Sequence, residues 1–190
     1  MSLHDPAVKV TDAEQALAYL KEGNARFVAN ELSAKDNYAD VRKTLAGGQQ
    51  PYAIVLCCAD SRVAPEIYFD QKLGDIFVIR NAGNVVDDIV LGSIEYGAEH
   101  LGSPLVVVLG HTSCGACTAA VQGGDVPRNI GEIMKKIAPS VEEGLSVDEV
   151  AAANAKAMAE EIKNDEIIKH LGTTVVPAVY NILSGEVEWL

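Results

Sequence analysis

Two short clusters of chemically reactive side chains stand out in this sequence. The first is Cys57-Cys58-Ala59-Asp60-Ser61-Arg62-Val63, and the second is His111-Thr112-Ser113-Cys114. Each cluster directly follows an apolar run of the length and composition of a buried strand. Thiols and an imidazole are ligands for a transition metal, and a carboxylate and a guanidinium lie beside them. The two clusters therefore predict a metal site with an acid and a base within reach of it.

The four cysteines form two tight pairs, at positions 57 and 58 and at positions 114 and 117. A secreted disulfide scaffold would spread them more evenly, so the pairs favour metal or redox chemistry. Cys57 neighbours Cys58 on a strand and should point to the opposite face, where we predict a small buried side chain. Cys117 completes a CxxC motif typical of thiol redox proteins, but that interpretation leaves His111 and the Cys58 cluster unexplained.

The ligands of the predicted site come from two strand ends. In open α/β sheets, ligands collect at the carboxyl ends of parallel strands, so Cys58 and His111 should meet although 53 positions separate them. With Cys114 they form a Cys₂His set with a free fourth position, one of the combinations found at catalytic zinc. The His-x-x-Cys spacing suits the start of a helix, where exposed amides lower a thiol's pKa. We predict one Zn²⁺ per subunit.

Three motifs together resemble those of the β-class carbonic anhydrases. They are Cys-x-Asp-Ser-Arg at 58–62, Arg80-Asn81-Ala82-Gly83-Asn84, and His-x-x-Cys-Gly at 111–115, and the resemblance extends from about Gln49 to Ala120. It implies a zinc enzyme that interconverts carbon dioxide and bicarbonate, built as a homodimer or homotetramer around a parallel sheet with exchanged N-terminal helices. It makes Cys58, His111 and Cys114 the zinc ligands and Asp60 with Arg62 the catalytic dyad.

The same resemblance assigns a substrate pocket. Gln49, Phe77, Ala82 and Tyr96 fall on positions that line the pocket in plant-type members, partly from the partner subunit. Gln49 indicates this plant-like subclass, whose dyad is usually open, rather than the bicarbonate-regulated one. The amide of Gly115 and the side chain of Gln49 could steady substrate oxygens, while the other residues supply a small dry pocket.

A mechanism can be argued for this set of residues. Zinc lowers the pKa of bound water to about 7 in carbonic anhydrases with three histidine ligands, which gives a zinc-bound hydroxide near neutral pH. Two thiolates cancel the formal charge of the metal, so this ligand set alone should acidify bound water less than three histidines do. Residues outside the ligand set must therefore contribute. An Asp60–Arg62 pair would hold the carboxylate off the metal and leave it orienting the hydroxide at carbon dioxide. Breaking this pair at acid pH could let Asp60 close the fourth position.

Two other functions fit the same residues. The scaffold could hydrolyse carbon disulfide or carbonyl sulfide, because these linear molecules could meet the same hydroxide. The cysteine pairs could instead serve a non-catalytic zinc or thiol redox sensor.

Composition limits the partners. The 190 residues carry 15 basic and 27 acidic side chains, a formal charge of −12, which disfavours nucleic acid and anionic lipid. Residues 1–6 lack the basic and apolar segments of a secretion signal, and no apolar run reaches the length of a membrane span. We therefore expect a cytoplasmic protein that binds neither nucleic acid nor membrane.

The pattern of elements predicts one α/β domain, with a central, mainly parallel sheet flanked by helices. Residues 1–48 form an N-terminal helical arm, 49–122 the catalytic core, and 123–190 the C-terminal helices and an antiparallel edge. The arm should pack on its own sheet or on a partner subunit. A Thr11–Glu14 capping box and one at Ser146–Glu149 begin two of the helices. Helices are predicted at 12–30, 41–45, 64–69, 87–101, 115–121, 130–137 and 146–170, and strands at 52–57, 75–80, 105–109, 173–180 and 186–190, with Pro177 at an edge.

Overall fold

A five-stranded sheet forms the centre of the protein in a computed structural model, which describes residues 9–34 and 37–190. The strand order is β2-β1-β3-β4-β5, with β1 to β4 parallel and β5 antiparallel to β4. The predicted α/β fold with a parallel sheet and an antiparallel edge is confirmed. The strands are β1 (Ala53–Cys58), β2 (Ile76–Asn81), β3 (Leu105–His111), β4 (Thr174–Tyr180) and β5 (Val187–Trp189).

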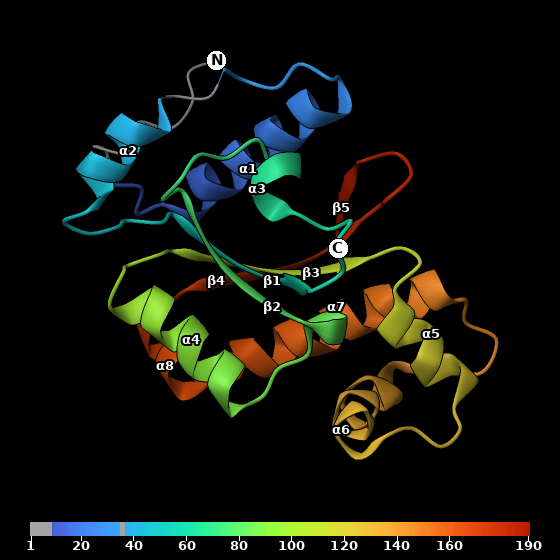
Figure 1. Cartoon of the computed structure of the whole chain (residues 1–190). Coiled ribbons are helices and arrows are strands. Elements are labelled where there is room, and N and C mark those ends of the chain that lie inside the picture. The colour runs from blue at the N-terminus through green and yellow to red at the C-terminus, as the bar shows by residue number, and fades with distance from the viewer. Residues whose placement is uncertain (1–8, 35–36) are drawn as a thin grey trace.

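Helices cover both faces of this sheet, as Figure 1 shows. On one side lie α1 (Ala13–Val28), α2 (Tyr38–Leu45) and α3 (Pro65–Tyr68). On the other side lie α4 (Asp88–Glu99), α5 (Gly115–Gln122), α6 (Arg128–Ile137), α7 (Val147–Lys163) and α8 (Glu166–Leu171). Two short 3₁₀ turns, η1 (Ala82–Asn84) and η2 (Ala138–Ser140), complete the described elements. None of the helices in the described part of the chain combines the length and the apolar character needed to cross a bilayer.

Alternation along β1 divides its side chains between two cores. Ile54, Leu56 and Cys58 join the core beneath α4 and α7, and Val55 and Cys57 join the core beneath α1 and α3. Both faces of the strand are buried, which accounts for its continuous apolar run. Cys57 is fully buried on the face opposite Cys58, as predicted.

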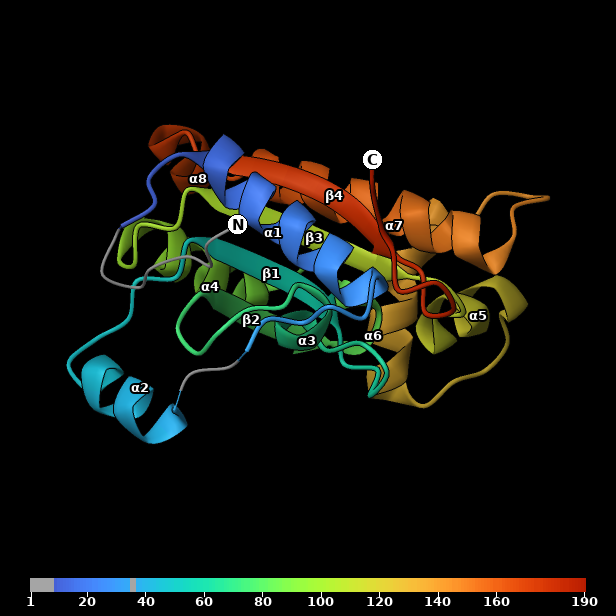
Figure 2. The same ribbon diagram turned by 90° about the horizontal axis from the view of Figure 1, so that it is seen from above.

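The N-terminal arm divides into two parts. Helix α1 covers its own sheet through Ala16 and Leu20, which are fully buried. Its N-cap is Asp12, whose carboxylate accepts from the Glu14 amide at 2.9 Å, so the predicted Thr11 capping box is wrong by one residue. Helix α2 buries none of its residues and lies apart from the sheet in Figure 2. The residues 1–6 discussed above lie outside the described part of the chain.

The long C-terminal helix predicted for residues 146–170 is two helices. The Ser146–Glu149 capping box begins α7 as expected. However, α7 ends at Lys163, and Asp165 caps a new helix by accepting from the Ile167 and Ile168 amides, both at 2.9 Å. Apolar periodicity continued through the break, so the sequence pattern alone did not show it.

The C-terminal hairpin lies at the sheet edge, as predicted, but the edge strand is β5 and not the strand that contains Pro177. Proline cannot donate a ladder hydrogen bond, and β5 pairs only with Ala178 to Tyr180. Beyond it, the Leu190 amide donates to the Pro177 carbonyl at 3.0 Å. The short edge strand thus ends beside the residue that has no amide hydrogen.

The strand order places a ligand site between β1 and β3. The chain moves from β1 to β2 on one side and returns to β3 on the other, so the connections diverge there. Such a switch point leaves a crevice at the carboxyl ends of the two strands. Cys58 ends β1 and His111 ends β3, so both candidate ligands lie at this crevice.

Candidate metal centre

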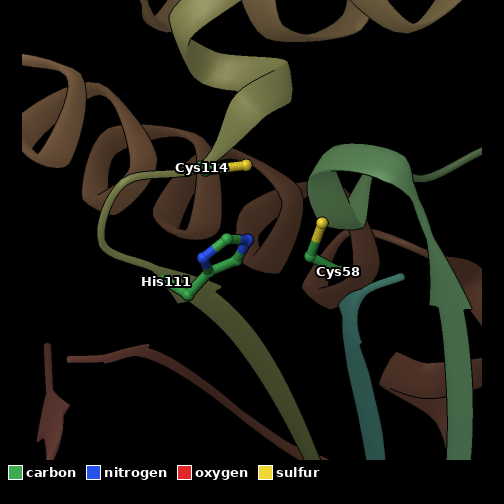
Figure 3. Close-up of side chains that lie close together, drawn as sticks. All are labelled: Cys58, His111 and Cys114. Atoms are coloured by element: carbon green, nitrogen blue, oxygen red, sulfur yellow. The ribbon is translucent and has the colours of Figure 1, made fainter. Parts of the chain in front are cut away.

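Three predicted ligands converge at the switch point. Cys58, His111 and Cys114 come from the end of β1, the end of β3 and the N-cap of α5, and their ligand atoms all lie within 4.8 Å of one another. Figure 3 shows the three side chains pointing toward a common space. All three residues are buried, whereas Cys57 and Cys117 are not members of this group.

The loop between His111 and Cys114 is held by β4. The Thr112 amide donates to the Tyr180 carbonyl at 3.0 Å, and the Thr112 hydroxyl accepts from the Ile182 amide at 3.1 Å. Ser113 then adopts a left-handed conformation with φ of 54°, which turns the chain so that Cys114 can cap α5. Few residues other than glycine adopt this conformation readily, so the turn needs support from its surroundings.

His111 presents an unprotonated nitrogen to the cluster. Its Nδ1 lies 2.9 Å from the Thr112 carbonyl oxygen, which can only accept a hydrogen bond, so Nδ1 carries the proton. Its Nε2 is then a lone-pair donor, buried and without a hydrogen-bond partner among the described residues. A buried acceptor that faces two thiols is costly unless a cation occupies the space between them. The donor set therefore fits Zn²⁺.

The thiols must lose their protons to bind a metal. The neighbouring Cys114 side chain and burial together raise the pKa of Cys58 to about 12, so this thiol is neutral near pH 7 in the metal-free chain. Thiolate is the form that binds metal, and metal binding displaces the proton. The site is thus built to release protons as it binds its ion.

Asp60 and Arg62 form the predicted pair beside the cluster. Arg62 Nε lies 2.9 Å from Asp60 Oδ1 and Arg62 Nη2 lies 2.7 Å from Asp60 Oδ2, which is a bidentate geometry. Hydrogen bonds from Arg62 hold the pKa of the Asp60 carboxyl well below its usual range. Arg62 Nη2 also approaches the Ser113 carbonyl at 3.3 Å, so the pair contacts the loop between the other two ligands.

The predicted pocket residues separate into two groups. Ala82 follows Asn81, which pairs with Cys58 across the sheet, and Gly115 follows Cys114, so both lie at the cluster. Phe77 pairs with Ile54, four positions and roughly 13 Å along the strand from Cys58. Tyr96 is next to Phe77, with ring centroids 6.3 Å apart. Gln49 precedes β1 at the same amino end.

Some residues at the cluster were missed by the sequence analysis. Arg80 holds the loop after β1, because its Nε donates to the Cys58 carbonyl at 3.1 Å and its Nη2 to the Asp60 carbonyl at 2.7 Å. The Gly83 amide points at Cys58 Sγ from 3.4 Å. Asn154, on α7, donates to the Gly83 carbonyl at 2.9 Å. Arg80 and Gly83 lay within a motif, and the only sequence signal for Asn154 was a polar residue among alanines.

Comparison with known families decides the identity of the fold. A family model described as carbonic anhydrase matches residues 53–187, which include all three candidate ligands. This chain belongs to the carbonic anhydrase family. Carbonic anhydrase 2 of Mycobacterium tuberculosis is 50% identical over 148 residues, covering 73% of this chain and 72% of the relative. The carbonic anhydrase of Mycolicibacterium smegmatis is 44% identical over 183 residues, covering 89% of each chain.

Solved structures place this carbonic anhydrase in the β class. A β-carbonic anhydrase of Coccomyxa, described in complex with acetazolamide, has a TM-score of 0.72 and 25% identity, covering 95% of this chain and 87% of the other. The β-carbonic anhydrase CafA of Aspergillus fumigatus has a TM-score of 0.73 and 28% identity, covering 93% and 89%. The protein is therefore a carbonic anhydrase enzyme with the β-class fold, as the three motifs predicted.

Proposed function

We propose that this carbonic anhydrase catalyses the reversible hydration of carbon dioxide to bicarbonate at one Zn²⁺ per subunit, held by Cys58, His111 and Cys114. The observation that carries the proposal is the buried Nε2 of His111, which has no hydrogen-bond partner among the described residues and lies within 4.8 Å of two thiol sulfurs. When bound, zinc supplies the Lewis acidity that makes water a nucleophile near neutral pH. The family and the relatives support carbon dioxide as substrate.

The chain's own residues orient and protect this chemistry. Arg62 holds the Asp60 carboxylate in a bidentate pair and keeps it ionised, so Asp60 can accept a hydrogen bond from the attacking water. The Gly115 amide, in the first turn of α5, is placed to donate to a substrate oxygen. Ala82 adds a small apolar wall beside Cys58. The bidentate Asp60–Arg62 pair supports the plant-like subclass, in which Asp60 stays off the metal.

We also propose that the pocket is completed across a subunit interface. Gln49, Phe77 and Tyr96 lie toward the amino ends of the strands, away from the metal ligands of their own chain. They can serve a site only if a second subunit presents them to it. A tetrameric β-carbonic anhydrase of Sordaria macrospora shares this fold with a TM-score of 0.74. A homodimer or homotetramer, active in the cytoplasm, agrees with these observations and with the acidic charge.

The proposal can be tested by zinc analysis and stopped-flow hydration assays. We expect one zinc per wild-type chain and rapid carbon dioxide hydration. The Cys58→Ala variant should lose both. The Asp60→Asn variant should keep its zinc and lose about 10–100-fold in activity, because Arg62 then has no charged partner and the water has only a neutral amide oxygen in place of an ionised acceptor.

Three results would count against this proposal. A zinc-loaded wild-type protein that hydrates no carbon dioxide from mildly acid to alkaline pH would favour a sensor. Faster turnover of carbon disulfide or carbonyl sulfide than of carbon dioxide would make the sulfur compounds the substrates. A wild-type protein that contains no zinc after purification, and binds none when zinc is added, would refute the assigned ligands.

A further inference from the structure

Helix α7 contacts both backbone segments that adjoin the metal ligands. It packs directly behind the sheet against β3 and β4, on the face that carries Cys58. The approach is close, because a Cβ added to Gly110 of β3 would lie 2.9 Å from the Ala151 carbonyl oxygen of α7. Residues on this helix can therefore reach the loops at the carboxyl ends of β2 and β3.

Asp148, in the first turn of α7, holds the loop between His111 and Cys114. Its Oδ1 accepts a hydrogen bond from the Ser113 amide at 2.7 Å, the short distance expected of a carboxylate acceptor. Ser113 has a φ of 54°, so its peptide orientation needs external support. On the other side of the same residue, Arg62 lies 3.3 Å from the Ser113 carbonyl. Ser113, which lies between the ligands His111 and Cys114, is thus held by hydrogen bonds at both its amide and its carbonyl.

Asn154, six residues further along α7, holds the carbonyl of Gly83, the residue whose amide faces Cys58. Its Nδ2 donates to the Gly83 carbonyl at 2.9 Å, and the Gly83 amide points at Cys58 Sγ from 3.4 Å. Gly83 has a φ of 79°, and an added Cβ would lie 2.8 Å from Ile137, so this position requires glycine. Glycine has no side chain that could pack and hold the backbone, so the backbone needs a partner. The amide of Asn154 therefore anchors the carbonyl side of the residue whose amide donates to the sulfur.

Burying the polar side chain of Asn154 costs free energy of folding, and its presence needs an explanation. Its side chain is fully buried, and its Oδ1 has no hydrogen-bond partner within the described residues. Its neighbours on α7 are mostly alanines, which would fill the same helix positions at lower cost. A buried amide with one unpaired oxygen destabilises the fold, so its presence is explained best by a function of the amide's other end. The task visible in the structure is the orientation of Gly83.

We propose that α7 is the positioning element of the metal centre: Asp148 fixes the Ser113 peptide, Asn154 fixes the Gly83 peptide, and together they hold the three ligands in a metal-binding arrangement. This inference rests on the proposed zinc site. Neither residue touches the metal, so both are positioning residues. Outer hydrogen bonds of this kind typically change metal affinity by about 10–100-fold when they are removed.

The test is the zinc affinity of substituted proteins, measured by competition with a chromophoric chelator. We expect Asp148→Ala and Asn154→Ala each to weaken zinc binding about 10-fold or more. Asp148→Asn should restore most of the loss, because an amide oxygen can still accept from Ser113. With Co²⁺ in place of zinc, Asn154→Ala should shift the sulfur-to-cobalt charge-transfer band, because Cys58 Sγ loses an oriented donor.

Matched controls separate positioning from helix stability. Glu149→Ala removes a carboxylate from the same turn as Asp148, but among the described residues the Glu149 side chain bonds only to Ser146, within the cap of α7. Asn164→Ala removes a side-chain amide that donates to the Glu160 carbonyl at the other end of the helix. Both controls should lower the melting temperature and leave the zinc affinity and the cobalt spectrum unchanged.

The possible failures are distinguishable. If wild-type protein binds no zinc, the proposed metal site fails, and the role of α7 fails with it. If wild type binds one zinc per chain and the α7 variants bind it within about 2-fold of wild type, only the role of α7 is refuted. Asp148 is exposed, so its replacement should leave a folded chain even if Asn154→Ala does not fold.

Discussion

The adjacent cysteines at the end of β1 point to opposite faces of the sheet. Cys58 faces the candidate ligands His111 and Cys114, and Cys57 faces the other core, because side chains alternate along a strand. Burial is the largest cause that raises the pKa of Cys57 to about 12 from its ordinary value of 9.0. The folded chain therefore binds this proton more tightly than the unfolded chain. The resulting stabilisation is complete below pH 9.0 and is lost as the pH rises toward about 12.

This difference gives a prediction for the paired variants Cys57→Ala and Cys58→Ala. Cys57→Ala should lower the free energy of unfolding by about 1 kcal/mol, through lost packing, and should leave zinc content and hydration activity intact. Cys58→Ala should lose zinc. Denaturant unfolding, zinc analysis and stopped-flow assays measure the three quantities. Native Cys57 should also resist alkylation at mildly alkaline pH, and rapid labelling of it would contradict the burial described here.

Much of the site was predictable at this scale, and the part that was not depends on distant contacts. Cys58, His111 and Cys114 could be brought together from the sequence because strand ends share one edge of a parallel sheet. The hydrogen bonds of Asp148 to Ser113 and of Asn154 to Gly83 span 35 and 71 positions. No periodicity or spacing marks such pairs, because they depend on how α7 lies across the sheet.

At the scale of elements, strand and helix types were predictable but their ends were less so. The sequence pattern predicted β3 as a central strand but ended it at Leu109, two residues before His111. The cap of α1 is Asp12 and not Thr11, because either side chain could accept from the first turn and the entry of the chain decides between them. The break between α7 and α8 was missed because apolar residues continue on both sides of Asn164.

The same break gives a prediction about helix capping. Asp165→Ala should lower the free energy of unfolding by about 1 kcal/mol, because the Ile167 and Ile168 amides lose their common acceptor. Denaturant unfolding measures the change. Glu166→Ala is the control, since it removes a neighbouring acid that is not the N-cap and should cost less. Equal stability of wild type and the Asp165→Ala variant would mean that α8 does not depend on this cap.

At the scale of the whole molecule, one chain holds the candidate metal ligands and the proposed pocket residues at different ends of its sheet. Helix α2 has no buried residue, and Tyr38 on it is 52% exposed. Tyr96 on α4 is 48% exposed beside the half-buried Phe77, at the edge formed by β2. This exposed apolar surface lies next to residues that are proposed to line the pocket of another subunit. It therefore favours an assembly in which subunits complete each other's sites.

Subunit mixing tests this arrangement directly. In a mixed assembly of Cys58→Ala and Gln49→Ala chains, the intact metal ligands of one chain should meet the intact Gln49 of the other, although neither variant assembles a complete site alone. For dimers that exchange at random, about a quarter of all sites in an equal mixture should become complete. Hydration activity should therefore rise after exchange above the sum of the separate variants, with native mass spectrometry confirming the mixed species. If mixed assemblies form without any gain, or if Gln49→Ala alone is fully active, each subunit builds its pocket without Gln49 from its partner, and the residues at the amino ends of the strands serve assembly or stability instead.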